Sequence, residues 1–145
     1  MGGLGNQMFQ YAFGKYLATK NDTELKLDTT FLLDRTLQKK HFVFRDYDLS
    51  IFNIDEQFST SKETHSLVNR TGNSTIDRNL NKLLSTKKSY VKDMGLKFKP
   101  NHLSILDNTY IEGYWQSEKY FHEIRINLNK TASHLSPLYL KYQPR

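Results

Sequence analysis

The sequence predicts an α/β fold, and three observations support that class. A glycine-rich turn at residues 2–5 leads directly into a segment, 6–19, whose apolar residues recur at three- and four-residue spacing, as in an amphipathic helix. Residues 25–28 then alternate between apolar and polar, as in a short strand. Residues 109–115 are rich in aromatic and β-branched side chains, which favour strands. Helices and strands that alternate along a chain are typical of α/β proteins.

The opening of the chain is the part around which the rest is organised. A turn, a helix and a strand in that order form the second part of a β-α-β unit, so a first strand is expected ahead of Gly2 and is missing from the sequence. Glycines allow close approach of a ligand to the backbone, and the first amides of a helix have no intrahelical partner. With Asn6 as the expected N-cap, this turn is suited to bind an anion such as a phosphate.

The middle of the chain carries weaker signals. A short helix is expected around 31–33, and 42–44 reads as a strand. Residues 59–75 are poor in large apolar groups and predict a surface excursion, and 78–84 fits a further helix. After the strand at 109–115 we expect a helix capped by Ser117, with a buried stripe made of Tyr120, Phe121, Ile124 and Leu128.

Composition limits the function classes. A chain of 145 residues is one domain, or half of a larger fold. The net charge of +6 is consistent with an anionic partner, but the lysines form only short pairs and no segment resembles a nucleic-acid platform, so nucleic acid is disfavoured. The absence of cysteine excludes disulfides and thiolate metal sites. No apolar run of the length of a signal peptide or membrane span is found, which favours a cytoplasmic location.

The glycine turn is neither a dinucleotide fingerprint, because position 8 is Met, nor a P-loop, because no Gly-Lys-Ser/Thr follows. A tight turn that only packs the helix on a sheet would also account for the glycines. The amides of Asn6 and Gln7 favour the functional alternative, because they offer donors and acceptors to a phosphate oxygen or a sugar hydroxyl.

A second constellation occupies residues 110–121, where aromatic side chains stand beside polar ones. Sugar-binding surfaces use this combination, since rings pack on the sugar face and polar groups bond its hydroxyls. Core packing accounts better for most of the aromatic residues. The polar side chains that stay open as site candidates are Glu112, Gln116 and Glu118.

Together, residues 2–12 (Gly-Gly-Leu-Gly-Asn-Gln-Met-Phe-Gln-Tyr-Ala) and 113–121 (Gly-Tyr-Trp-Gln-Ser-Glu-Lys-Tyr-Phe) resemble the α-1,2-fucosyltransferases, and 31–35 and 47–49 are similar to weaker landmarks of that family. The resemblance implies an inverting glycosyltransferase of the GT-B type, with two Rossmann-like domains. Such an enzyme takes GDP-fucose as donor, needs no metal or other cofactor, and fucosylates a terminal galactose of a glycan or lipid-linked oligosaccharide, as in O-antigen biosynthesis. The substrate-binding residues that it suggests are Gly3, Gly5, Asn6, Gln7, Gln116 and Glu118.

Two departures from the family pattern shape the expectation for the chain. The first strand is missing before Gly2, and no histidine begins the donor-binding signature His-x-Arg-Arg-x-Asp. Residues 1–145 are therefore expected to be the amino-terminal, acceptor-side domain, without the carboxy-terminal donor-binding domain and with little or no activity alone. The basic surface leaves peripheral contact with the inner face of the membrane open.

An inverting transfer needs a base near the acceptor hydroxyl. Glu112 and Asp28 are the candidates, because each lies at a predicted strand end. Two alternatives to an enzyme are open: a non-catalytic sugar- or nucleotide-binding module, and a basic surface-interaction protein whose binding would collapse with added salt.

Overall fold

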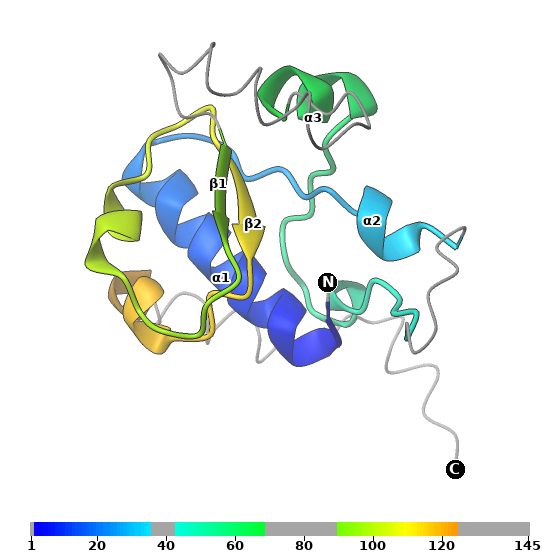
Figure 1. Ribbon diagram of the computed structural model, residues 1–145, viewed down its shortest axis with the longest axis horizontal. Helices are drawn as coiled ribbons and strands as arrows, with labels where there is room; N and C mark the ends of the chain where they lie inside the picture. The colour runs from blue at the N-terminus through cyan, green and yellow to red at the C-terminus, as the bar shows by residue number, and fades with distance from the viewer. Residues whose placement is uncertain (1, 36–42, 69–89, 125–145) are drawn as a thin grey trace.

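A computed structural model describes residues 2–35, 43–68 and 90–124 (Figure 1). The described parts combine helices with a small parallel sheet, which is compatible with an α/β fold. The elements in chain order are α1 (Leu4–Lys20), α2 (Thr30–Leu33), η1 (Leu49–Ile51), α3 (Ser61–Leu67), β1 (Tyr90–Asp93), η2 (Pro100–Ser104), β2 (Tyr110–Gly113), η3 (Glu118–Tyr120) and η4 (His122–Ile124). The predicted helix at 78–84 lies outside the described residues.

Helix α1 confirms the predicted amphipathic helix but starts two residues earlier. Gly3 is the N-cap, because its carbonyl oxygen accepts from the amides of Asn6 at 3.0 Å and Gln7 at 3.3 Å. The expectation that Asn6 is the N-cap is therefore wrong, and Gly5 lies within the first helical turn. At the other end the helix stops at Lys20, and the left-handed residue that follows is Asp22, with φ of +53°.

Strands β1 and β2 pair in parallel, and β2 confirms the strand predicted at 109–115. The register pairs Tyr90 with Tyr110, Val91 with Ile111, Lys92 with Glu112 and Asp93 with Gly113. Because side chains alternate along a strand, the two faces differ in character. Val91 and Ile111 pack against the core beside α1, whereas the opposite face carries the side chains of the Tyr90–Tyr110 and Lys92–Glu112 pairs.

Helix α1 runs antiparallel to β2. Near its amino end, Gln10 Nε2 donates to the carbonyl oxygen of Gly113 at 2.7 Å, at the carboxyl end of the strand. At its other end, Lys20 Nζ donates to the Leu103 carbonyl at 2.6 Å and Asn21 Nδ2 to that of Ile105 at 3.1 Å, both ahead of β2. The amino terminus of α1 therefore lies beside the carboxyl ends of the strands (Figure 1).

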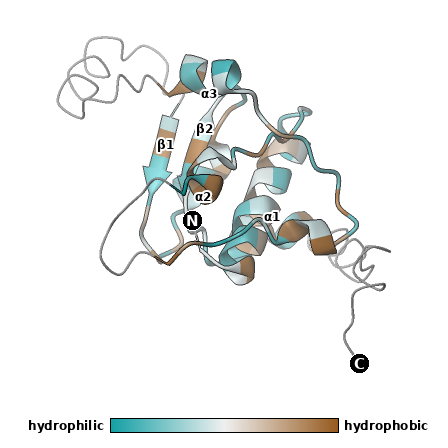
Figure 2. Ribbon diagram, turned by 90° about the vertical axis from the view of Figure 1, so that its right-hand side faces the viewer, coloured by the Kyte–Doolittle hydropathy of each residue, from teal (hydrophilic) through white to brown (hydrophobic). Residues whose placement is uncertain are grey.

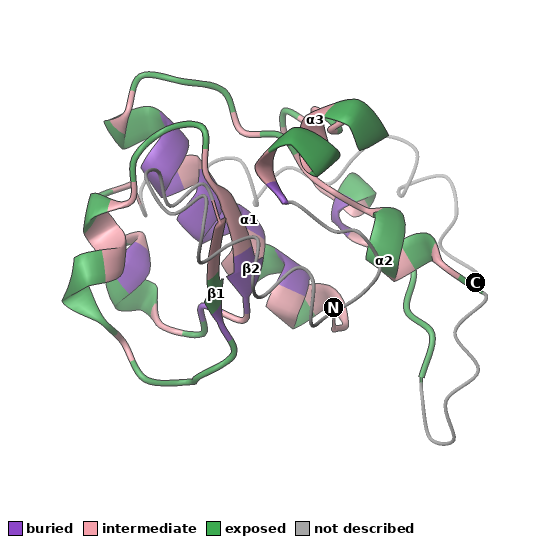
Figure 3. Ribbon diagram, turned by 45° about the horizontal axis from the view of Figure 1, so that its top comes forward, coloured by how far each residue is buried: buried purple, intermediate pink, exposed green. Residues whose placement is uncertain are grey.

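The core is an aromatic cluster that joins α1 to the segment after β2. Phe13 is fully buried, and its ring centroid lies 4.7 Å from those of both Trp115 and Tyr120. Such pairs add about 0.5–1.5 kcal/mol each beyond the burial of apolar area. Figure 3 shows the buried residues concentrated in α1, with fewer at the carboxyl ends of β1 and β2, and α3 largely exposed. The sequence favoured core packing for most of the aromatic residues of 110–121. The structure confirms this for Trp115 and Tyr120.

Other local expectations need correction. The short helix at 31–33 is confirmed as α2, but residues 43–44 form no strand, and 25–28 contributes a single parallel bridge, Leu27 to Phe58. The described part of the predicted excursion holds α3, whose capping box between Thr60 and Glu63 stabilises a helix even in an apolar-poor segment.

The helix predicted after β2 is also different from the expectation. Ser117 caps as expected, accepting from Lys119 N at 3.4 Å, but it precedes only the short 3-10 segments η3 and η4. Tyr120 is buried, whereas Phe121 and Ile124 are half-buried, and Leu128 lies outside the described residues.

A polar cluster at the end of β1 makes the fold sensitive to acid. Lys99 holds the pKa of the Asp93 carboxyl below its usual range, with Nζ 2.6 Å from Oδ2. His102 lies 3.6 Å from the same oxygen and 3.3 Å from the Tyr120 hydroxyl, and burial lowers its pKa although Asp93 opposes the shift. Folding therefore disfavours protonation of His102, so stability is full above its unfolded pKa near 6.5 and falls as the pH drops below it.

We expect the free energy of unfolding to decrease between pH 7.5 and pH 5.5, and His102→Gln to reduce this slope. Denaturant titration at each pH measures the effect. His122→Gln, at an exposed histidine, is the matched control and keeps the wild-type slope. An unchanged slope in the His102 variant would contradict the assignment.

Gly113 lies at the carboxyl end of β2, where its carbonyl oxygen accepts a hydrogen bond from Gln10 of α1. A Cβ at this position would collide with the Asp93 carbonyl and lie 2.9 Å from the Trp115 ring. We expect Gly113→Ala to cost about 1–3 kcal/mol of stability, because the obstacle includes backbone. Gly5→Ala has open space and a helical position, so it is expected to be neutral or stabilising. Similar thermal midpoints for the two variants would refute this view.

Candidate functional site

A hollow of about 660 Å³ lies at the carboxyl ends of β1 and β2, beside the amino terminus of α1. In open α/β sheets ligands bind at this edge. Both sequence motifs contribute to its lining, together with α2 and the segment before Asp46. The lining residues are Gly2, Asn6, Phe31, Leu32, Val43, Arg45, Lys92, Met94, Leu96, Glu112, Tyr114 and Gln116. In Figure 2 the carboxyl end of β1, next to this hollow, has the hydrophilic colour.

One hydrogen bond joins the two motifs directly. Gln116 Nε2 donates to Asn6 Oδ1, so residues 110 positions apart in the sequence meet at the hollow. The turn before them depends on Gly2, whose φ is +142° and where a Cβ would collide with the Asn6 side chain. A Cβ added at Gly3 or at Gly5 would meet open space. The structure therefore requires a glycine at only Gly2 among these three positions.

Glu112 is a buried carboxylate on the wall of the hollow, with 7% of its surface exposed. Its Oε1 accepts from Lys92 Nζ at 2.7 Å, and its Oε2 accepts from the Tyr90 hydroxyl. A buried carboxylate is maintained only when it is paired and hydrogen-bonded, and these two partners from β1 meet that need. Each carboxylate oxygen can accept more than one hydrogen bond.

The remaining glycine-turn candidates lie outside this lining. Gln7 is buried; its Nε2 donates to the carbonyls of Gly2 at 3.2 Å and Asp46 at 2.8 Å, and its Oε1 accepts from Asp48 N at 2.9 Å. The Gln7 side chain therefore links the glycine turn to the backbone of residues 46–48 through hydrogen bonds. Gly3, Gly5 and the exposed Glu118 are also absent from the residues that line the hollow.

The two candidate bases are placed in different hollows. Asp28 Oδ2 accepts from the Tyr110 hydroxyl at 2.8 Å and Oδ1 from Thr30 N at 2.9 Å, and the residue lines a second hollow of about 720 Å³. Tyr90 and Tyr110, which bond to Glu112 and Asp28 respectively, have ring centroids 5.8 Å apart. Only Glu112 is brought together with Asn6 and Gln116.

Two cations of the hollow, Lys92 and Arg45, were missed by sequence reasoning. The signal for Lys92 was the alternation of Tyr90, Val91 and Lys92, which has the two-residue period of a strand. Arg45 carries no comparable signal, because its segment has no regular structure. With half of its side chain exposed, Lys92 offers positive charge both to Glu112 and to a bound anion.

Two kinds of feature are absent from the described residues. No set of three or more His, Asp or Glu side chains there is arranged to hold a metal ion. None of the helices among residues 2–35, 43–68 and 90–124 has the length and apolar character that crossing a membrane requires.

A small parallel sheet, with a helix amino terminus and a hollow of amide, carboxylate and cationic side chains at its carboxyl edge, is compatible with a sugar-handling α/β protein. The chain is 33% identical over 148 residues to an alpha-1,2-colitosyltransferase from Escherichia coli. The match covers 93% of this chain and 47% of the relative, so the chain spans about half the length of the relative. This similarity supports a glycosyltransferase. No family model and no solved structure matches.

Proposed function

We propose that this chain forms the amino-terminal, acceptor-side part of a galactoside α-1,2-fucosyltransferase of the GT-B type. The whole enzyme would transfer fucose from GDP-fucose to the terminal galactose of a glycan or lipid-linked oligosaccharide, with inversion and without a metal. The observation that carries the proposal is the meeting of the two fucosyltransferase-like stretches, through Asn6 and Gln116, in one hollow. The relative's name supports an α-1,2 transfer of a sugar.

In this reaction the acceptor hydroxyl attacks C1 of the donor sugar, the bond from C1 to the phosphate oxygen breaks, and GDP leaves. Glu112 receives the proton of the hydroxyl. Its bonds from Lys92 and Tyr90 hold the carboxylate in a fixed position within the wall. A general base of this kind contributes typically 10²–10⁴-fold to the rate.

The leaving diphosphate requires positive charge that is in place before the bond breaks. The amino terminus of α1, Lys92 and Arg45 border the same hollow and supply part of it. Asn6 and Gln116 provide amide donors and acceptors for sugar hydroxyls, and the Tyr114 ring offers a face for the apolar side of a pyranose.

We expect Glu112→Gln in the whole protein to lower kcat by about 10²–10⁴-fold with a smaller change in KM, because the amide cannot accept the proton. Coupled detection of released GDP measures the rate. Glu123→Gln, at an exposed carboxylate outside the hollow, is the matched control. Circular dichroism checks that both variants fold, and a variant with nearly normal kcat would eliminate Glu112 as the base.

Asn6→Ala in the whole protein is expected to lower kcat/KM at least tenfold, since a lost substrate hydrogen bond costs about 1–3 kcal/mol. Asn101→Ala, at an exposed asparagine in η2, is the control and changes kcat/KM little. Equal effects would reject the site. Parallel assays with GDP-fucose and GDP-colitose identify the donor, and consumption of the colitosyl donor alone would replace the fucosyl assignment while keeping the site.

The 145-residue chain alone is expected to release no GDP from GDP-fucose with lactose as acceptor, because it spans about half of its relative and contains no His-x-Arg-Arg-x-Asp sequence. Turnover by the purified chain would contradict the division of the site between two domains.

A further inference from the structure

Lys92 and Glu112 form a cross-strand pair whose two members differ in exposure. They are register partners on β1 and β2, so their side chains leave the same face of the sheet. Lys92 Nζ donates to Glu112 Oε1 at 2.7 Å. The side chain of Glu112 is 8% exposed, whereas that of Lys92 is 49% exposed. The carboxylate is therefore held in the wall, while the ammonium group stays accessible from the hollow that both residues line.

Two further described groups act on this pair. The Tyr90 hydroxyl donates to Oε2 of Glu112, and a hydrogen bond to the ionised form of a carboxyl favours that form. Arg45 lines the same hollow and adds a second positive charge. Among the described residues of this lining, Glu112 carries the negative charge, and Lys92 and Arg45 carry the positive ones. Protonation of Glu112 therefore makes the hollow more positive.

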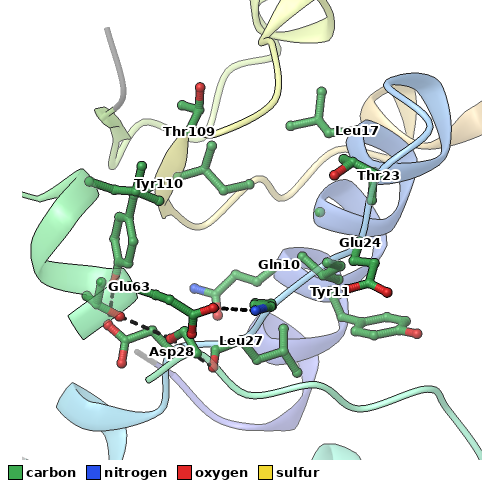
Figure 4. A pocket seen from close by; sticks show the side chains of 18 of the residues that line it. Gln10, Tyr11, Leu17, Thr23, Glu24, Leu27, Asp28, Glu63, Thr109 and Tyr110 are labelled. Carbon is green, nitrogen blue, oxygen red and sulfur yellow. Dashed lines mark hydrogen bonds and ion pairs between the residues drawn. The ribbon is translucent and has the colours of Figure 1, made fainter. Parts of the chain in front are cut away.

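The second tyrosine-bonded carboxylate lies in a hollow of opposite charge. Tyr110 donates to Asp28 at 2.8 Å in the second hollow (Figure 4). Lys26 is the cation among the described residues that line it, and it pairs with Glu63. The carboxylates of the same lining are Asp22, Glu24, Asp28, Glu63 and Asp107. A diphosphate is therefore attracted to the hollow at Lys92 and repelled from the second hollow.

The proposed transfer moves a negative charge past Lys92. The O–H bond of the acceptor breaks and its proton goes to Glu112, the acceptor oxygen bonds to C1, and the electron pair of the bond from C1 to the phosphate leaves with GDP. One negative charge thus disappears at Glu112, and one appears on the diphosphate. A neutral carboxyl is the weaker partner for an ammonium group, because hydrogen bonds to an ionised acceptor are roughly twice as strong.

We propose that Lys92 is a further catalytic residue, whose positive charge is paired with Glu112 before the transfer and with the leaving diphosphate after it. This inference rests on the proposed function, in which Glu112 is the base and GDP is the leaving group. Proton transfer to Glu112 frees the Lys92 charge at the stage of the reaction where negative charge develops on the diphosphate. The cation is already in place, so it stabilises that charge without reorganisation of the site.

The test measures the affinity of the whole protein for GDP by isothermal titration calorimetry. Glu112→Gln imitates the protonated base and leaves the Lys92 charge uncompensated, so we expect it to bind GDP about tenfold more tightly than the wild type. Adding Lys92→Met to Glu112→Gln is expected to abolish this gain, whereas adding Lys92→Arg, which keeps the charge, retains most of it. Lys97→Met, at an exposed lysine outside the hollow, is the matched control and leaves the affinity unchanged.

The paired variants also guard against misfolding. Lys92→Met alone leaves a buried carboxylate without its cation, but the double variant with Glu112→Gln carries no such charge and is the one compared. Equal tightening with and without Lys92 would overturn the proposal. A loss of kcat in Glu112→Gln without tighter GDP binding would overturn the role of Lys92 alone. Failure of the wild-type protein to bind GDP would overturn both this role and the proposed function.

Discussion

The contact of Phe13 with Trp115 and Tyr120 is the interaction on which the arrangement of the described residues depends. It joins the helix at the start of the chain to the segment after β2, which lies about 100 residues later. Gln10 fixes the same pair of elements at the strand end by bonding to the Gly113 carbonyl. Together these contacts set the antiparallel direction of α1 relative to the sheet, and therefore which end of the helix meets which end of the strands.

The chemistry of the candidate site follows from that direction. If the amino terminus of α1 lay at the opposite edge, Asn6 and Gln116 would lie at opposite ends of the sheet. As it is, Asn6 in the first turn of the helix, Glu112 and Lys92 border one hollow. The polar face of the two strands supports this placement, since the tyrosines of one register pair each hold a carboxylate: Tyr90 bonds to Glu112 and Tyr110 to Asp28. Glu112 therefore lies with Asn6 and Gln116, and Asp28 lies in the other hollow.

The sequence was informative where a local pattern decides the structure. The periodicity of 6–19 predicted α1, and the β-branched and aromatic run predicted β2. It was less informative where tertiary packing decides. Nothing local shows that the Gln7 amide binds the backbone of Asp46 and Asp48, or that Arg45 lies at the hollow. The strand predicted at 25–28 is reduced to one parallel bridge, from Leu27 to Phe58, among the described residues.

The central claim is that the two motifs form one substrate site at the carboxyl edge of the sheet. The most direct test is a crystal structure of the whole protein with GDP-fucose and a galactoside acceptor. We predict substrate atoms within hydrogen-bond distance of Asn6 and Gln116, with the acceptor hydroxyl on Glu112. Substrates bound elsewhere, for example against Asp28 in the second hollow, would contradict the claim.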